Sequence, residues 1–196
     1  RDILSAETKR TVVEVALDAA ADVLGFTHSG VHFVDEDARA LVPVAWTGSL
    51  EDEVGEPPAL GPDSMAWEVY EAGASVCVDD LWDSEGVHNP DTPFRSEMVL
   101  PLGEHGVSLF SSTEPVAFDE DDRRFAEVLC SNATAALDRI GRERELRRRI
   151  ELQARLTADV ERSVAELSET ARSVSGSSQQ ISSLAGGQAK TMSDVT

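Results

Sequence analysis

The segment from Asp119 to Thr196 constrains the fold most, because its residue pattern predicts one long helix. Asp119 places a carboxylate where a helix N-cap is expected, and the acidic residues after it suit the positive end of the helix dipole. In the first third, apolar residues recur at helical spacing on what we predict to be one face: Phe125, Val128, Leu129, Ala133, Leu137 and Ile140. We expect this face to pack onto a globular domain.

The remainder of this segment is polar and carries a heptad repeat. Alternating steps of three and four residues back from Val195 keep one register over eleven positions: Val195, Met192, Gln188, Ala185, Ile181, Ser178, Val174, Ala171, Leu167, Val164 and Val160. Such a repeat predicts a coiled coil, so we expect a homodimer that forms through the C-terminal helix. Small and polar residues at several core positions favour a dynamic bundle over a maximally stable one.

The apolar pattern of residues 125–140 and the heptad repeat of the tail differ in phase near Gly141. Steps of four and then three residues from Ile140 reach Arg147, whereas the tail register predicts Leu146. A slip of one residue corresponds to about 100° of rotation in a helix of 3.6 residues per turn. Glycine in a helix interior costs ~1 kcal/mol. We therefore expect Gly141 and Leu146 to lie where a signal passes from one face to the other.

Aromatic content and charge place a domain boundary near the same point. All ten aromatic residues lie at or before Phe125, so only the first part of the chain can build a large core. Residues 1–140 carry 29 acidic and 8 basic side chains, whereas residues 141–196 carry 8 and 9. We predict a globular domain in residues 1–140 and a linker helix with the start of a coiled coil in residues 141–196.

The excess of acidic side chains restricts the expected class of partner and the expected source of the protein. The formal charge is 17 − 37 = −20, which argues against a nucleic-acid partner for the globular part. Only Lys9 and Lys190 are lysines among the 17 basic residues. An acid-coated surface of this kind suits a cytoplasm at very high salt, where the screening length is ~3 Å at 1 M. We expect a halophilic source; an acidic protein from a GC-rich mesophile is the alternative.

The expected location is the cytoplasm. No apolar run approaches the ~20 residues of a membrane span, and no signal peptide is present. Because Arg1 is not an initiator methionine, we expect a piece of a longer chain. Cys77 and Cys130 are expected to be free thiols, since disulfides are rare in a reducing compartment.

The first 118 residues are typical of an α+β domain. Two stretches have a helical pattern, 1–25 and 64–72, and five are predicted to be strands: 27–34, 40–47, 75–79, 95–103 and 106–112. In the second strand we expect Val42, Val44 and Trp46 to share one face. Residues 48–63 and 80–93 are predicted to be long loops of functional importance. Because the strands are consecutive or separated by one short helix, an antiparallel sheet flanked by helices is favoured.

One segment carries a family resemblance. Residues Arg95–Phe118, RSEMVLPLGEHGVSLFSSTEPVAF, followed by DEDDRRFAEVL, resemble a GAF domain of the kind found in haloarchaeal signalling proteins. The resemblance covers roughly residues 5–140. It implies a five- or six-stranded antiparallel sheet, with the terminal helices on one face and a small-molecule pocket on the other. Ser112 and Thr113 stand where cyclic-nucleotide binders of the family have Asn-Lys, so cyclic nucleotide is unsupported.

The tail resembles the start of the signalling region of methyl-accepting chemotaxis transducers. SGSSQQISS, around Gln179 and Gln180, is similar to the family's methylation consensus, although Leu184 misses its small-residue requirement. The resemblance makes these two glutamines candidate sites of deamidation and methylation, which change charge on the bundle surface. It also implies that the full-length protein docks a chemotaxis histidine kinase and a coupling protein.

The candidate ligand pocket is assembled from aromatic and other large side chains. They are Trp46, Trp67, Cys77, Trp82, Phe94, Arg95 and Met98. Trp46, Cys77 and Met98 have an alternative as plain core, and Arg95 either recognises an anion or forms a structural salt bridge. The four histidines are too scattered for a metal site; haem at His88 or His32 and bilin attachment at Cys77 are weaker alternatives. The cofactor and the ligand remain unidentified.

We therefore expect a sensory transducer, not an enzyme, because no catalytic constellation is present. In this hypothesis the GAF domain binds a small ligand or a partner and controls a methyl-accepting signalling helix. One alternative is a sensor for a histidine kinase, which would need a phosphoacceptor histidine, yet none follows His105. Another is a haloarchaeal helix-turn-helix transcription activator, whose tail should lead to a basic globular segment.

Overall fold

The computed structural model describes residue 3, residues 6–84 and residues 92–193; beyond residue 170 it describes the side chains of residues 174 and 176–178. The chain forms two compact units, Arg1–Glu143 and Arg144–Thr196. Glu143 is three residues beyond the predicted boundary at residue 140. Within the described part of the chain, no helix has both the length and the apolarity needed to cross a membrane.

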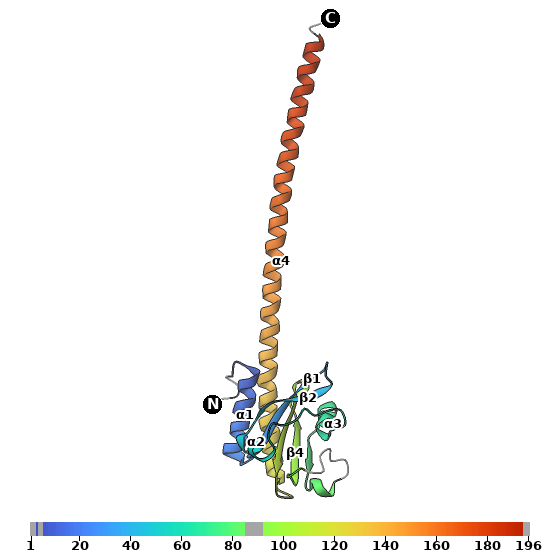
Figure 1. Cartoon of the computed structure of the whole chain (residues 1–196). Coiled ribbons are helices and arrows are strands. Elements are labelled where there is room, and N and C mark those ends of the chain that lie inside the picture. Colours follow the sequence, from blue (N-terminus) through green and yellow to red (C-terminus); the bar gives the residue numbers. More distant parts are fainter. Residues whose placement is uncertain (1–2, 4–5, 85–91, 194–196) are drawn as a thin grey trace. The chain divides into compact units, whose positions relative to one another are not determined.

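The first unit is built on a five-stranded antiparallel sheet (Figure 1). Its strands are β1 (His28–Asp35), β2 (Ala40–Trp46), β3 (Val76–Val78), β4 (Ser96–Pro101) and β5 (Gly106–Ser112). They lie in the order β2-β1-β5-β4-β3. Each pair is antiparallel, so the α+β sheet predicted from the strand spacing is confirmed.

The described residues form four α-helices: α1 (Lys9–Leu24), α2 (Gly48–Val54), α3 (Met65–Ala72) and α4 (Glu120–Ser193). The side chain of Thr8 caps α1, and Gly25 ends it in the left-handed conformation at φ 75°. Helix α2 corrects the prediction that residues 48–63 form a loop throughout. Leu50, on the buried side of this short helix, packs against the sheet. This burial stabilises the helix although the surrounding glycine and proline residues favour a loop.

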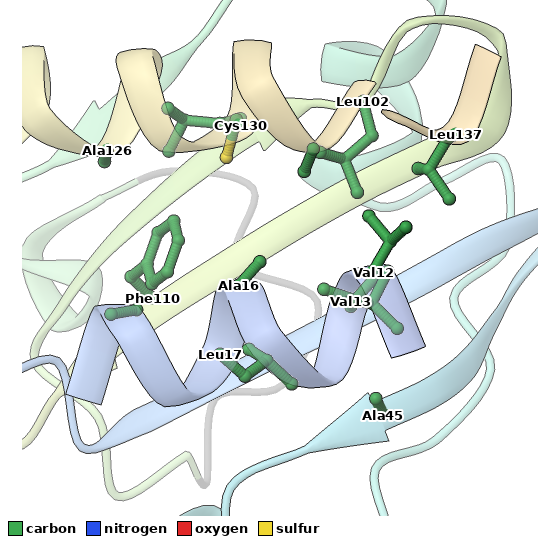
Figure 2. Packing of buried hydrophobic residues seen from close by; sticks show 14 of the residues in the cluster. Val12, Val13, Ala16, Leu17, Ala45, Leu102, Phe110, Ala126, Cys130 and Leu137 are labelled. Atoms are coloured by element: carbon green, nitrogen blue, oxygen red, sulfur yellow. The ribbon is translucent and has the colours of Figure 1, made fainter. Parts of the chain in front are cut away.

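One face of the sheet is covered by α1 and the first part of α4. Figure 2 shows side chains of the two helices pointing into a common layer with Phe110 and Leu102. The cluster includes Val12, Val13, Ala16, Leu17, Ala126, Cys130, Ala133 and Leu137. Small residues on α4, such as Ala126 and Ala133, let the helix approach closely. This layer is the main hydrophobic core.

The opposite face, which we call the open face, is covered by shorter elements. Beneath α3, Trp67 and Val69 pack on Leu41, Val99 and Val107 of the strands. A second small cluster consists of Leu50, Leu81 and Phe94, with Trp46, Met65 and Val78 packed against it. Side chains from β1, β4 and β5 form the floor under these two clusters.

The prediction that Val42, Val44 and Trp46 share one face is wrong. Pairing of β1 with β2 shifts by one residue between Val31 and His32, which inserts a bulge beside Pro43. Val44 therefore packs on the α1 and α4 side, Trp46 packs on the open face, and Val42 is partly exposed. Proline lacks the N–H that regular pairing needs, so a bulge on this edge strand accommodates it.

The start of α4 follows the sequence prediction closely. Oδ1 of Asp119 accepts hydrogen bonds from the backbone N–H groups of Asp121 and Asp122, each at 2.9 Å. The carboxylate of Asp122 in turn accepts from the N–H of Asp119 at 3.1 Å. This reciprocal arrangement is a capping box, and it explains the acidic run.

The buried face of α4 agrees with the predicted one at Ala133, Leu137 and Ile140 and differs from it at Phe125 and Val128. Phe125 and Val128 are 57% and 60% exposed, and the buried residues are Ala126, Cys130, Ala133, Ala136, Leu137 and Ile140. Two stripes therefore coexist on residues 125–140: a buried one, and an exposed one that lies one residue earlier. A core of alanines could not be recognised by apolar spacing alone, because the larger exposed side chains dominate the pattern.

The exposed stripe has the phase of the tail heptads. Phe125 precedes Leu146 by 21 residues and Val160 by 35, and both differences are multiples of seven. Leu146 and Val160 are 59% and 61% exposed, like the later members of the register. Phe125 thus has the phase of the tail register, whereas Val128 lies outside that register and Ala136, which lies within it, is fully buried. The buried stripe ends at Ile140, next to Gly141, where the sequence places the slip.

Gly106 offers a test of the fold. Its φ is 142°, and a Cβ added there would lie 2.0 Å from the carbonyl oxygen of His32. We predict that Gly106→Ala lowers the free energy of unfolding by about 3 kcal/mol, since the backbone of β1 cannot yield like a flexible side chain. Urea unfolding followed by circular dichroism measures it. Gly61→Ala, which meets nothing within 4 Å, is the control and should be nearly neutral.

Candidate functional site

The sheet separates the residues predicted to form one pocket. Trp46, Trp67 and Phe94 lie on the open face, in its two apolar clusters. Met98 is fully buried on the other face with α1 and α4, and Cys77 packs against that same cluster. Alternation along β3 and β4 is the reason, because neighbouring strand residues point to opposite sides. Met98 and Cys77 therefore cannot line the open face.

Trp82 and Arg95 form a clasp with Asp80. Nε of Arg95 donates to Oδ1 of Asp80 at 2.9 Å, and its Nη2 binds the second carboxylate oxygen. The guanidinium carbon lies 4.3 Å from the centroid of the Trp82 ring. The Arg95 hydrogen bond lowers the pKa of Asp80 below its usual value. Arg95 is thus engaged in the structural salt bridge that the sequence left open, and Trp82 remains 60% exposed.

A polar row crosses the floor of the open face. Glu97 on β4 pairs with Ser111 on β5, which pairs in turn with His28 on β1. The Ser111 hydroxyl donates to Oε1 of Glu97 at 3.0 Å. The His28 ring lies 5.4 Å from that of Phe94, centroid to centroid. We call Glu97, Ser111 and His28 the polar row.

Glu97 is the notable member of this row. Burial raises the pKa of its carboxyl group to about 7, and the hydrogen bond from Ser111 only partly opposes that shift. The carboxyl group is therefore divided between its neutral and ionised forms near neutral pH. The sequence analysis missed Glu97, although an acid inside the strand Ser-Glu-Met-Val-Leu was a usable signal. Strand alternation alone predicts that such a residue faces away from the main core, with no indication of what covers it.

His32 is buried further along the same face. It is 3% exposed, and its Nε2 lies 3.1 Å from the carbonyl oxygen of Pro58. Burial lowers the pKa of His32, so the ring is neutral and Nε2 carries the proton that binds this carbonyl. In the part of the chain that the structure describes, no group of three His, Cys, Asp or Glu residues could hold a metal ion. His88, the other histidine considered for haem, lies outside the described residues.

A groove of about 510 Å³ lies at the edge of the first unit, between α1 and the β2–α2 connection. Its walls carry acidic side chains, among them Glu14, Asp18 and Asp22, together with Trp46. The indole Nε1 of Trp46 donates to Oε2 of Glu51 at 3.1 Å. Trp46 therefore lies at the border of this groove and the open face. An acid-lined groove of this kind identifies no ligand by itself.

The end of the first unit is held by a second polar cluster, which we call the latch. His105 lies between two partners, with Nε2 at 2.9 Å from Oδ1 of Asp138 and Nδ1 at 3.4 Å from Nζ of Lys9. Arg139 donates from Nη2 to the carbonyl oxygen of Ala6 at 2.6 Å. The latch thus joins the start of α1, the β4–β5 turn and the last buried turn of α4.

The remaining predicted residues lie on α4. Gly141 directly follows the latch, and a Cβ added there would meet nothing within 4 Å. Leu146 is 59% exposed in the second unit. Gln179 and Gln180 are helical, and their side chains lie outside the described residues.

The raised pKa of Glu97 gives a test by pH. A folded-state pKa of about 7 above an unfolded value of 4.5 means that the native state binds more protons between these values. The contribution of Glu97 to stability is therefore present below about pH 4.5 and lost as the pH rises through 7. We predict that Glu97→Gln gains stability relative to the parent chain as the pH rises from 5 to 8. Urea unfolding at several pH values measures the difference; a difference that does not change with pH would contradict the assignment.

The comparisons with known proteins agree with this architecture. A family model of the GAF domain matches residues 6–138. The structure resembles the free methionine-R-sulfoxide reductase of Neisseria meningitidis in complex with its substrate (18% identity, 72% of this chain, 84% of that chain, TM-score 0.63). It also resembles residues 122 to 287 of a methyl-accepting chemotaxis protein (16%, 70%, 93%, 0.59). A third similar structure is a domain of a putative two-component sensor histidine kinase from Sinorhizobium meliloti 1021 (19%, 72%, 99%, 0.55).

The comparison with curated proteins gives no match. Because the family model covers more than half of the chain, and the five-stranded sheet with its terminal helices on one face agrees with it, the chain belongs to the GAF domain family.

Proposed function

We propose that this chain is the sensory part of a cytoplasmic signal transducer, in which the GAF domain binds a small ligand and controls a helical output of the methyl-accepting chemotaxis type. One observation carries the proposal: α4 bears both the buried stripe of the domain and an exposed heptad stripe. A ligand that changes the packing of the sheet would act on the first stripe. The same helix would then carry the change into the second.

The exposed stripe is the proposed dimer seam. Phe125, Leu146, Val160 and Leu167 share one heptad position, and each is more than half exposed. Apolar side chains repeated in this way are stabilised when a second helix covers them. The second unit has its apolar side chains in solvent throughout the described part, so a second copy of the chain is the simplest partner. Parallel pairing would bring each of these residues against its own counterpart.

The latch supplies a route for the signal. It joins the N-terminal end of α1 and the β4–β5 turn to Asp138 and Arg139, immediately before Gly141. A shift of β4 or β5 beneath a bound ligand would therefore reach the last buried turn of α4. Gly141 lies two residues and Leu146 seven residues after Arg139. Helix rotation or altered pairing beyond Gly141 is the proposed output.

The methyl-accepting output rests on the sequence of the tail and on one similar structure. That structure is part of a methyl-accepting chemotaxis protein. In a full-length transducer the partners would be a chemotaxis histidine kinase and its coupling protein, and Gln179 and Gln180 would be candidate modification sites. The similar domain from a putative sensor histidine kinase favours the alternative of a kinase output. A phosphoacceptor histidine would then have to lie beyond residue 196, since the tail contains none.

A sensing role fits the chemistry of this chain better than catalysis. Two similar structures are free methionine-R-sulfoxide reductases, so the fold itself permits catalysis. In this chain, burial raises the pKa of Cys77, and that of Cys130 to about 12, which keeps both in the unreactive thiol form. The acidic surface, with a formal charge of −20, argues against a nucleic-acid partner and agrees with a halophilic setting.

Disulfide trapping tests the dimer seam. Asn132→Cys and Val160→Cys place thiols at the proposed core position, whereas Ser131→Cys and Asp159→Cys place them one residue away. Core positions of paired parallel helices lie within the Cα separation of ~4.4–6.8 Å that a disulfide needs. We predict that mild oxidation cross-links the two core variants much faster than the two neighbours, on non-reducing gels. The parent chain, in which Cys130 is buried and Cys77 partly buried, sets the background.

The pattern of cross-links separates the possible outcomes. Cross-linking at Val160 alone would confine the seam to the second unit. Equal rates at core and neighbouring positions would contradict a defined register. Absence of cross-linking at both core positions would remove the homodimer and, with it, the proposed mode of output.

The cross-linking rate of Val160→Cys also tests whether a ligand controls the pairing of the helices. Native mass spectrometry of the purified chain identifies a co-purified small molecule, and its removal should change the cross-linking rate of Val160→Cys. Gly141→Ala, which is sterically free and adds ~1 kcal/mol of helix propensity, should leave folding intact and reduce that change. A response that is unchanged in Gly141→Ala would place the transmission step elsewhere.

A further inference from the structure

The polar row is chemically out of place on the open face. Val78 lies opposite Glu97 on β3, and Val99 and Leu109 follow on the same side of β4 and β5. Phe94 packs on the His28 ring from above. A glutamate in such surroundings has lost much of its hydration, and it has only one hydrogen-bond donor, the Ser111 hydroxyl, among the described residues.

Among the residues of the first unit that the structure describes, no cation forms an ion pair with this carboxylate. Arg95, the basic residue two positions before it, is held by both oxygens of Asp80 and stacks on Trp82. The elements around Glu97 contribute Val78 from β3, Ser111 from β5 and His28 from β1. On α2, Glu51 accepts a hydrogen bond from the Trp46 indole. Glu97 is half-buried, and a carboxylate that has lost part of its hydration without gaining a counter-charge is costly unless a ligand supplies one.

We propose that Glu97 and Ser111 bind the ammonium group of a small amine whose apolar body packs against Phe94 and its neighbours; this inference rests on the sensory function proposed above. The ammonium group would pair with the Glu97 carboxylate, which remains oriented by the Ser111 hydroxyl. The aromatic face of Phe94 adds a second favourable contact for a cation. Leu50, Leu81 and Val78 provide the surroundings that an apolar body requires.

The site couples ligand binding to pH. An ammonium ion needs the ionised carboxylate, whereas in the free protein burial places the pKa of Glu97 at about 7. Binding should therefore release a proton near neutral pH and should strengthen as the pH rises. Only protein molecules in which the Glu97 carboxyl group is ionised can bind the ammonium group. The apparent affinity for the amine at pH 6 should therefore be about tenfold weaker than at pH 8.

Matched probes make the proposal testable. The amines are 2-phenylethylamine and isopentylamine, and their neutral counterparts are 2-phenylethanol and isopentanol. We expect the amines, and not the alcohols, to raise the thermal unfolding midpoint of the full chain, with a larger increase at pH 8 than at pH 6. Titration calorimetry at pH 6.5 in buffers of different ionisation enthalpy should show proton release on amine binding.

Two variants assign the effect to the polar row. Glu97→Gln keeps the shape of the side chain and the neutral form that the fold tolerates, so it should stay folded and lose amine affinity about tenfold or more at pH 8. Ser111→Ala should weaken binding less. Glu104→Gln, on the exposed turn between β4 and β5, is the matched control and should bind like the parent chain.

The proposal is overturned if the alcohols stabilise as much as the amines, if neither amine binds, or if Glu97→Gln retains the parent's amine affinity. These failures leave the sensory function standing if a neutral or anionic molecule co-purifies and its removal changes cross-linking at Val160→Cys. If no small molecule affects cross-linking, the sensory function fails as well. The two hypotheses are therefore separable in one set of variants.

Discussion

The packing of α4 against α1 and the sheet is the interaction on which the rest of the structure depends. It buries Ala126, Cys130, Ala133 and Leu137 against α1 and the strands, and it leaves Phe125 on a different face. Small side chains at the contact bring the helix close to the sheet, so little room remains for independent movement. In the proposed function, a displacement of the strands would therefore reach α4, while the exposed stripe would pair with a second helix.

The open face has a different physical character. Its apolar cover comes from short elements, α2, α3 and the turn around Leu81, instead of from two long helices. Short elements with small clusters open at lower cost than a continuous core, which is what a ligand site requires. The clasp of Asp80, Trp82 and Arg95 fastens one side of this cover, and the polar row lies on the floor beneath it. In the function proposed above, recognition and output would therefore lie on opposite faces of one sheet.

Sequence reasoning performed best where a local pattern decides the structure. The strands, the helix α3 and the capping box at Asp119 follow from alternation, capping chemistry and acidic residues in the first turn. The predictions were wrong where tertiary packing decides the structure. The bulge opposite His32 turns Val44 and Trp46 to different faces of the sheet. Packing of Leu50 helps part of a predicted loop to form α2. For the site, residue type suggested one pocket, yet the sheet separates Met98 and Cys77 from Trp67 and Phe94.

The sequence by itself determined that the chain has a globular α+β part and a heptad-bearing helix, because composition and periodicity act locally along the chain. Only the tertiary structure decided which stripe of α4 is buried, since alanines become core only when a second surface approaches them. It also decided that Glu97 is the unusual residue of the open face. The local pattern marks an acid inside a strand, but the raised pKa of its carboxyl group comes from loss of hydration beside Val78 and Ser111, which are distant in the sequence.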